Sequence, residues 1–236
     1  ARFNGGLALI SGPMRSGRTT TVASMIQRII DSRPSAVLTV ENPVEFDLIS
    51  KGSVISHREI GRDVISLETA VEALGKEDFD ICFFGDVTGK SAFRAVAQSS
   101  ITGVMTFACT YANSASETLD HFFAGFDESE RSWVARMVSN SLRFVINQKL
   151  IPGVGGRPVL ASELLLPTPS IRKAIRAENF DLINESILAD GTKAGMVTMN
   201  QSLMNLLVKR KIELRNAFES SPDPDELDQM LKKAGI

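Results

Sequence analysis

The sequence contains little cysteine and little histidine, which limits the sites it can build. Its 236 residues include two cysteines, Cys82 and Cys109, both within apolar runs, and two histidines, His57 and His121, far apart in the chain. Cysteines of this kind fit buried reduced thiols, because a disulfide framework or a zinc cluster needs several suitably spaced ligands. We expect neither a disulfide-stabilised domain nor a zinc site.

Long apolar runs and an excess of one charge are also missing. The longest apolar stretches, such as residues 81–85 and 159–167, are far shorter than the ~20 residues of a membrane-spanning helix, and no signal-peptide pattern opens the chain. The 26 basic and 28 acidic residues nearly cancel, so no long-range field favours nucleic acid or anionic lipid. We expect a cytoplasmic protein with no nucleic-acid partner and no direct membrane insertion.

What the sequence does contain is a regular alternation of short apolar segments and amphipathic ones. This pattern predicts strands at residues 7–11, 36–40, 54–56, 80–84 and 104–109, and helices at 20–31, 66–74 and 90–98. Strands that are nearly all apolar and alternate with helices predict a parallel sheet covered on both faces. Helices at 114–123 and 128–141 then precede two strands, 144–150 and 158–166, that we expect to extend the sheet.

From Pro169 onward the pattern is helical. It predicts helices at 169–177, 182–190, 199–209, 214–219 and 223–233, with breaks at Gly191, at Gly195 and at Ser221-Pro222. We therefore predict an α/β fold with two parts: a core with a mainly parallel sheet over residues 1–168, and a C-terminal helical subdomain over residues 169–236.

The segment Gly12 to Thr19, GPMRSGRT, has the spacing of the phosphate-binding loop GxxxxGK[ST] and lies between a predicted strand and a predicted helix. In such a P-loop the backbone amides hold the phosphates, a lysine bridges the β- and γ-phosphates, and the hydroxyl binds magnesium. The candidate ATP-binding residues are Gly12, Pro13, Arg15, Ser16, Gly17, Arg18, Thr19 and Thr20. The alternative is a plain strand–turn–helix junction that binds no ligand.

Two positions of this loop depart from the pattern. Arg18 stands where the lysine is expected, and its longer, planar guanidinium cannot act as a compact point charge. Arg15 occupies a crowded position that is often glycine. Binding can survive such changes while the geometry of phosphoryl transfer suffers.

Several further segments resemble the PilT/PilU retraction ATPases, a branch of the type II and type IV secretion ATPases, and the resemblance covers essentially the whole chain. LTVENPVEF at 38–46 resembles the family's acidic box LTIEDPIEF, and HREIGRD at 57–63 resembles its QREVGxD stretch. SIRKAIR at 170–176 is similar to the AIRNLIRE motif, although an ordinary amphipathic surface helix would also account for it.

The resemblance implies a RecA-like P-loop core that uses ATP and magnesium. It implies catalytic roles for Glu41 and Glu45, which would hold the metal and orient water. It also implies assembly into a homo- or hetero-hexamer with PilT-like subunits, action on an inner-membrane pilus platform protein, and a place at the cytoplasmic side of the inner membrane.

The same resemblance identifies further substitutions. The run ending FFGD places Asp86 where the family has its Walker B glutamate, so Asp86 is the third candidate catalytic residue and, with Thr19 and Glu41, a candidate magnesium ligand. Its side chain is one methylene shorter, and a misplacement of about 1 Å can cost on the order of a hundredfold in rate. The remaining changes are at Asn42, Glu72, Lys76 and Thr88, and at Val104 and Tyr111, which replace the two histidines of the family's histidine box.

These substitutions favour a regulatory nucleotide-binding subunit whose hydrolysis is weak or lost and which works beside an active paralogue. The alternative is an active hexameric motor that hydrolyses ATP and drives pilus retraction; a small-molecule P-loop kinase has no lid or acceptor signature here. The sequence lacks the four-cysteine zinc loop of pilus-assembly motors, and the family's N-terminal PAS-like domain does not precede the loop. We therefore expect a fragment that is monomeric or weakly oligomeric on its own.

Overall fold

A computed structural model describes residues 5–74 and 76–235 of the chain. Its centre is one seven-stranded sheet in the order β3-β2-β4-β5-β1-β6-β7. The strands are β1 Gly6–Ser11, β2 Ala36–Glu41, β3 Val54–Glu59, β4 Ile81–Phe84, β5 Met105–Thr110, β6 Leu142–Pro152 and β7 Pro158–Leu165. Each neighbouring pair is parallel except β6 and β7, which form an antiparallel hairpin. The predicted mainly parallel α/β fold is confirmed.

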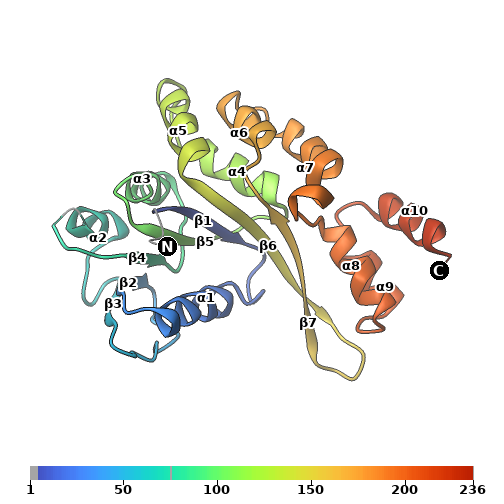
Figure 1. Cartoon of the computed structure of the whole chain (residues 1–236), viewed down its shortest axis with the longest axis horizontal. Coiled ribbons are helices and arrows are strands. Elements are labelled where there is room, and N and C mark those ends of the chain that lie inside the picture. Colours follow the sequence, from blue (N-terminus) through green and yellow to red (C-terminus); the bar gives the residue numbers. More distant parts are fainter. Residues whose placement is uncertain (1–4, 75, 236) are drawn as a thin grey trace.

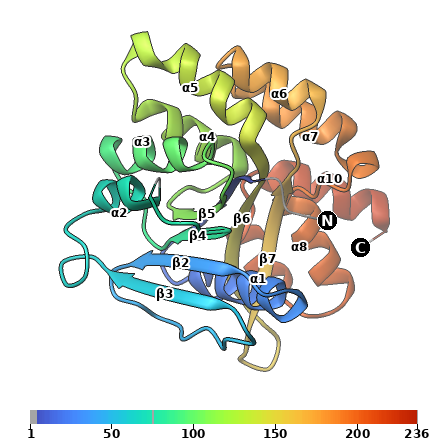
Figure 2. The same cartoon turned by 60° about the vertical axis from the view of Figure 1, so that its left-hand side comes forward.

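Helices cover both faces of this sheet (Figures 1 and 2). On one face lies α1, Arg18–Ser32, whose Val22, Ile26 and Ile30 pack against the even-numbered residues of β1. The other face carries α2 Leu67–Leu74, α3 Lys90–Ser99, α4 Ala115–Ala124 and α5 Glu128–Ser141. Because successive strand residues point to opposite faces, Leu7 and Leu9 enter one apolar cluster while Ala8 and Ile10 enter the other. This explains why the strands are apolar throughout.

The helices that follow β7 divide between two apolar clusters. Both α6, Pro169–Arg176, and α7, Asp181–Ala194, pack their buried side chains into the cluster shared with α2 to α5. The last three helices, α8 Met199–Val208, α9 Leu214–Ser220 and α10 Pro224–Ala234, form a separate cluster with Ile151 and Ala161 of the β6–β7 hairpin. Figure 1 shows these helices beyond β7, at the end of the molecule away from β3. The division of the chain at residues 168 and 169 stays a prediction.

Two local expectations differ from the structure. The third strand continues to Glu59, because every residue of β3 from Val54 pairs with β2. The predicted break at Gly191 is wrong, since α7 runs through it to Ala194. One glycine inside a helix costs about 1 kcal/mol, which packing of Ile183 and Ile187 into the core readily offsets. No helix within residues 5–74 and 76–235 combines the length and hydrophobicity needed to cross a bilayer.

Candidate functional site

The predicted site residues follow strands that end at the same edge of the sheet. The P-loop leaves β1 after Ser11, Glu41 is the last residue of β2, and Asp86 comes two residues after β4. Backbone hydrogen bonds from Gly85 to Val40 (2.9 Å) and from Val87 to Cys109 (2.8 Å) hold the segment on either side of Asp86 against its neighbours. The carboxyl edge of a parallel sheet is where α/β proteins bind ligands.

The backbone of the P-loop requires glycine at both ends. Gly12 has φ 149°, and a Cβ there would lie 2.2 Å from the carbonyl oxygen of Gln148. Gly17 has φ 83° and is the N-cap of α1. The first amides of α1 therefore face the loop without an intrahelical acceptor, as in other anion-binding helix N-termini. Pro13 and Thr20 are exposed at the rim of the loop, whereas Ser16 is buried.

Arg15 is unusual in its backbone conformation as well as in its side chain. Its φ is 61°, in the left-handed region that glycine adopts freely and that other residues enter at a cost of roughly 1 kcal/mol. Its side chain is exposed.

Arg18 and Tyr111, both substituted relative to the family pattern, contact each other. The Arg18 guanidinium carbon lies 3.8 Å from the centroid of the Tyr111 ring. Its Nη1 donates a hydrogen bond of 2.5 Å to the carbonyl oxygen of Thr110, the last residue of β5. The charge that a P-loop lysine would direct at phosphate is thus engaged by the neighbouring strand end.

The three carboxylates differ in environment. Glu41 is 3% exposed, and burial is the main cause that raises its pKa; the nearby charge of Glu45 raises it further, while hydrogen bonds from Thr39 and from the backbone of Glu45 oppose the shift. Glu45 and Asp86 are exposed. Glu41 and Thr19 line the same small cavity, together with Phe46 and Leu48.

The charged candidate residues also act electrostatically on the end of β5. Burial raises the pKa of the Cys109 thiol to about 12; Arg18 lowers it, and Glu41, Asp86 and Glu45 each raise it. These four charges therefore all act on one buried atom of β5. The structure brings Arg18, Glu41, Glu45 and Asp86 into one neighbourhood, while their catalytic roles stay predictions.

The residues present fit a nucleotide phosphate with a magnesium ion. Helix α1 offers unpaired amides to phosphate, and the Thr19 hydroxyl and Glu41 carboxylate are oxygen donors of the type magnesium prefers. Over the described part of the chain there is no group of three or more His, Cys, Asp or Glu side chains arranged to hold a metal. Magnesium usually binds through one or two protein groups together with phosphate oxygens.

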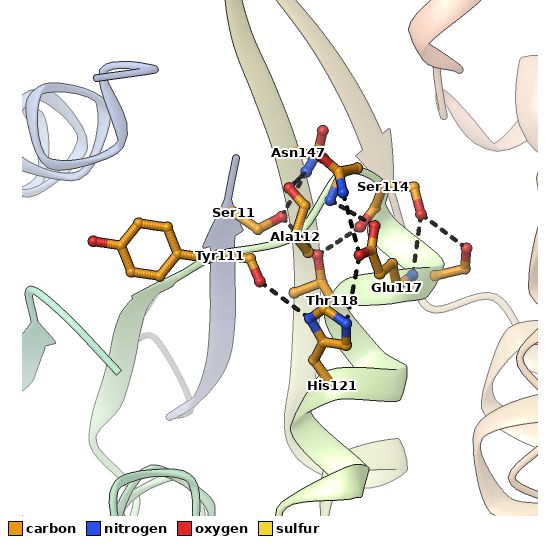
Figure 3. A network of polar contacts seen from close by, with 10 residues as sticks. Ser11, Tyr111, Ala112, Ser114, Glu117, Thr118, His121 and Asn147 are labelled. Carbon is orange, nitrogen blue, oxygen red and sulfur yellow. Dashed lines mark hydrogen bonds and ion pairs between the residues drawn. The ribbon is translucent and has the colours of Figure 1, made fainter. Parts of the chain in front are cut away.

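A buried polar network supports the backbone next to Tyr111 (Figure 3). Asn147 Nδ2 donates to Ser11 Oγ and to the carbonyl of Ala112, both at 2.9 Å. Ser11 Oγ shares a 2.6 Å hydrogen bond with Thr118 of α4. His121 Nδ1 lies 3.3 Å from the Tyr111 carbonyl oxygen, and the Tyr111 ring points away from this network. The network fixes the strand end and leaves the ring free to meet Arg18.

The structure places one of the two substituted histidine positions away from this site. Val104, predicted to replace a phosphate-sensing histidine, precedes β5 at the opposite edge of the sheet, where it lines a cavity with Lys76 and Thr102. A six-residue strand is about 20 Å long, so Val104 cannot share a phosphate with Tyr111. The sequence analysis did not identify Asn147 and Gln148, because no local motif marks them. They contact Ser11 and Ser16, from which 136 and 132 positions separate them.

Comparisons with known proteins agree with this geometry. A model of the family described as "Type II/IV secretion system protein" matches residues 2–184. The type IV pilus retraction ATPase PilT of Pseudomonas aeruginosa is 33% identical over 93% of this chain and 64% of its own length. A twitching motility protein of Neisseria gonorrhoeae is 34% identical over 86% of this chain and 54% of its own length. The chain thus spans between about half and two thirds of these relatives.

Solved structures give the same result for the fold. A crystal structure of the pilus retraction motor PilT with bound ADP superposes with a TM-score of 0.88, at 34% identity over 95% of this chain and 64% of that one. The ATPase DotB of Legionella pneumophila superposes with a TM-score of 0.83 at 21% identity, over 99% of this chain and 61% of that one, which supports the fold alone. By the family match and by the shared sheet, loop and strand-end geometry, the chain belongs to the type II/IV secretion system protein family.

Proposed function

We propose that this chain is the nucleotide-binding core of a pilus-retraction or secretion type ATPase in which hydrolysis is weak or lost, and that it acts as a regulatory partner of an active paralogue. Its binding residues would be Gly12, Pro13, Arg15, Ser16, Gly17, Arg18, Thr19 and Thr20, with Glu41, Glu45 and Asp86 around the γ-phosphate and Thr19, Glu41 and Asp86 as magnesium ligands. The ADP bound to PilT, a relative with the same fold, supports a nucleotide as ligand.

The contact between Arg18 and Tyr111 carries this proposal. Phosphoryl transfer depends almost wholly on positioning and on electrostatic stabilisation of the γ-phosphate. Arg18 is instead held by the Thr110 carbonyl and the Tyr111 ring. Moving it to the phosphate would break a charged hydrogen bond of about 1.5–3 kcal/mol and a cation–π contact of about 0.5–1 kcal/mol. Removing one preorganised group costs roughly 3–4 kcal/mol of transition-state stabilisation, so this loss alone would slow turnover strongly.

Binding has separate support. The backbone amides at the start of α1 do not depend on the substituted side chains, and the left-handed Gly17 holds the helix N-terminus in the anion-binding arrangement. We therefore expect nucleotide affinity to survive better than catalysis.

The partners and location are part of the same proposal. A regulatory subunit would enter a homo- or hetero-hexamer with PilT-like subunits and act, through them, on an inner-membrane pilus platform protein from the cytoplasmic side. The second candidate function is an active hexameric motor for twitching motility. One observation favours it: Thr19 and the buried Glu41, two of the candidate magnesium ligands, line one small cavity.

Calorimetric titration of ATP into the chain, with and without magnesium, and a turnover assay test the proposal. The comparison is with a variant carrying Arg18→Lys, Asp86→Glu and Tyr111→His together. We expect binding by both proteins and measurable turnover only by the variant. Turnover by the unsubstituted chain at ~1 s⁻¹ or faster, as in an ordinary enzyme, would establish the motor function instead. Two inactive proteins would show that these three substitutions do not explain the loss.

A further inference from the structure

Gln148 lies directly beneath the P-loop, although nothing in the local sequence marks it. Strand β6 runs parallel to β1, with Asn147 opposite Ser11, so Gln148 comes level with the first residue of the loop. Its side chain is fully buried, and its Nε2 donates a 2.8 Å hydrogen bond to the carbonyl oxygen of Ser16. The backbone carbonyl oxygen of Gln148 lies against Gly12, where an added Cβ would be 2.2 Å from it.

We propose that Gln148 is a positioning residue that aims the backbone amide of Gly17 at a bound phosphate. This rests on the proposed nucleotide site. A trans peptide unit is planar, so its C=O and the N–H of the next residue point in opposite directions. Gln148 turns the Ser16 carbonyl toward β6 in the core. The Gly17 N–H therefore points away from the core, to the side of the loop where a phosphate group is held.

Two unpaired buried atoms mark the same place. In the described part of the chain, neither Gln148 Oε1 nor Ser16 Oγ has a hydrogen-bond partner, although their residues are 0% and 2% exposed. Burying a polar atom without a partner is costly, and each such atom in a native structure calls for a specific explanation, such as an ordered water or a bound ligand. One of these atoms belongs to the P-loop and the other to the residue that supports it.

Only a donor of this length suits the position. Methionine matches glutamine in length and fits similar space, but it cannot donate to the Ser16 carbonyl. An ionised glutamate at this position has only acceptor oxygens, so it repels the Ser16 carbonyl oxygen. A protonated glutamate has an O–H that can donate to that oxygen. Burial raises the pKa of a carboxyl group, so acidification converts the repelling form into the donating form within an accessible pH range.

The next residue along β6 supplies a matched control. Lys149 also donates one side-chain hydrogen bond to a backbone carbonyl, from Nζ to Ser220 at 3.1 Å. Adjacent strand residues point to opposite faces, so this bond ties β6 to the end of α9 and does not touch the loop. Lys149→Met thus removes a comparable bond from the same strand.

The test is the affinity of the purified chain for ADP, inorganic pyrophosphate and adenosine, measured by calorimetry at pH 8 and pH 6. We expect Gln148→Met to bind ADP and pyrophosphate at least about tenfold more weakly, with little change for adenosine, while Lys149→Met binds all three like the unsubstituted chain. Gln148→Glu should be weak at pH 8 and recover toward pH 6 by a larger factor than the unsubstituted chain. A merely structural role would not produce this recovery.

Each outcome separates this inference from the proposed function. Unchanged pyrophosphate affinity in Gln148→Met, or Gln148→Glu without recovery at pH 6, overturns the inference and leaves nucleotide binding intact. If the unsubstituted chain binds neither ADP nor pyrophosphate, both fall. Should the variants not fold, side-chain amide signals of the unsubstituted chain in NMR spectra give the answer. Those of Gln148 must shift on addition of pyrophosphate, while those of Gln201, whose side chain accepts a hydrogen bond from the Thr198 amide at the start of α8, stay in place. Unmoved Gln148 signals would refute the role.

Discussion

Glu163 shows how a single buried residue can set a pH dependence. It lies on β7 with 6% of its surface exposed, and its Oε2 accepts a 3.0 Å hydrogen bond from the Ala115 amide at the start of α4. Burial raises the pKa of Glu163 to about 7, against the opposing effects of that amide and of Lys149. Burial also lowers the pKa of Lys149. Removal from water therefore disfavours the charged form of both groups.

The raised pKa of Glu163 predicts that ionisation of this residue destabilises the fold. In the folded state the Glu163 carboxyl keeps its proton up to about pH 7. In the unfolded state its pKa has the ordinary value of 4.5, so the carboxyl loses the proton at lower pH. The free energy of unfolding should therefore fall as pH rises from about 4.5 through 7. Glu163→Gln should remove this fall and be more stable than the unsubstituted chain at pH 8, by on the order of 2 kcal/mol, with little difference at pH 4.5.

Urea denaturation at pH 4.5, 6, 7 and 8 measures this difference. The exposed Glu128, changed to Gln, is the control and should give a curve parallel to that of the unsubstituted chain. If the Glu163→Gln curve is parallel as well, Glu163 does not titrate in this range.

At the scale of elements, α6 and α5 stabilise each other through a helix end. Ile171 and Ile175 of α6 are buried in the core. On its other side, Arg172 donates hydrogen bonds to the carbonyls of Ser139, Asn140 and Leu142 at the C-terminus of α5. Terminal helix carbonyls have no intrahelical donor and favour nearby cations. The SIRKAIR segment is thus amphipathic, as its spacing indicates, and its arginine face serves a neighbouring helix.

We expect Arg172→Met to lower the free energy of unfolding by about 1–2 kcal/mol, because partly buried carbonyls at the helix end lose their donor. Arg172→Lys should recover only part of this stability. The planar guanidinium of arginine directs several N–H groups at separate carbonyls, which the compact ammonium group of lysine cannot do. Thermal and urea denaturation measure the effect, and Lys173→Met, on the exposed side of α6, is the control. Equal stability of the Arg172→Met and Lys173→Met proteins would rule out the capping role.

At the scale of the whole molecule, the helices that follow β7 belong to two different apolar clusters, and this division predicts which parts of the chain unfold first. Among the described residues, α6 and α7 share a cluster with the sheet, whereas α8, α9 and α10 form a cluster with each other and the hairpin. Cooperative units of a fold exchange their amide hydrogens together. In native-state hydrogen exchange we expect amides of α8 to α10 to open at a lower free energy than those of β1 and β5, and amides of α6 to open with the sheet.

This experiment also tests the division between residues 168 and 169. If α6 and α7 exchange together with α8 to α10, the C-terminal helical subdomain begins at residue 169. If α6 follows the sheet, the independent unit begins near α8. Leu203→Ala removes a fully buried side chain from the cluster that α8 to α10 form with the hairpin. It should lower the opening free energy of α8 to α10 alone.

The sequence by itself determined what depends on neighbouring positions. Apolar runs such as 7–11 and 36–40 specify strands buried on both faces, and the spacing from Val22 to Ile30 specifies the face of α1. The P-loop was equally readable, because Gly12 and Gly17 meet backbone requirements that lie within eight residues of each other. Parallel strands also place Glu41 and Asp86 at one edge of the sheet, which follows from connectivity alone.

Only the tertiary structure decided which distant residues meet. Arg18 contacts Tyr111 because β1 and β5 are neighbours in the sheet, and Gln148 reaches the P-loop because β6 lies on the other side of β1. The same strand geometry carried Val104 to the opposite edge. Contacts of this kind depend on strand order and register, which form when the whole sheet assembles, so no pattern within a short window of sequence can specify them.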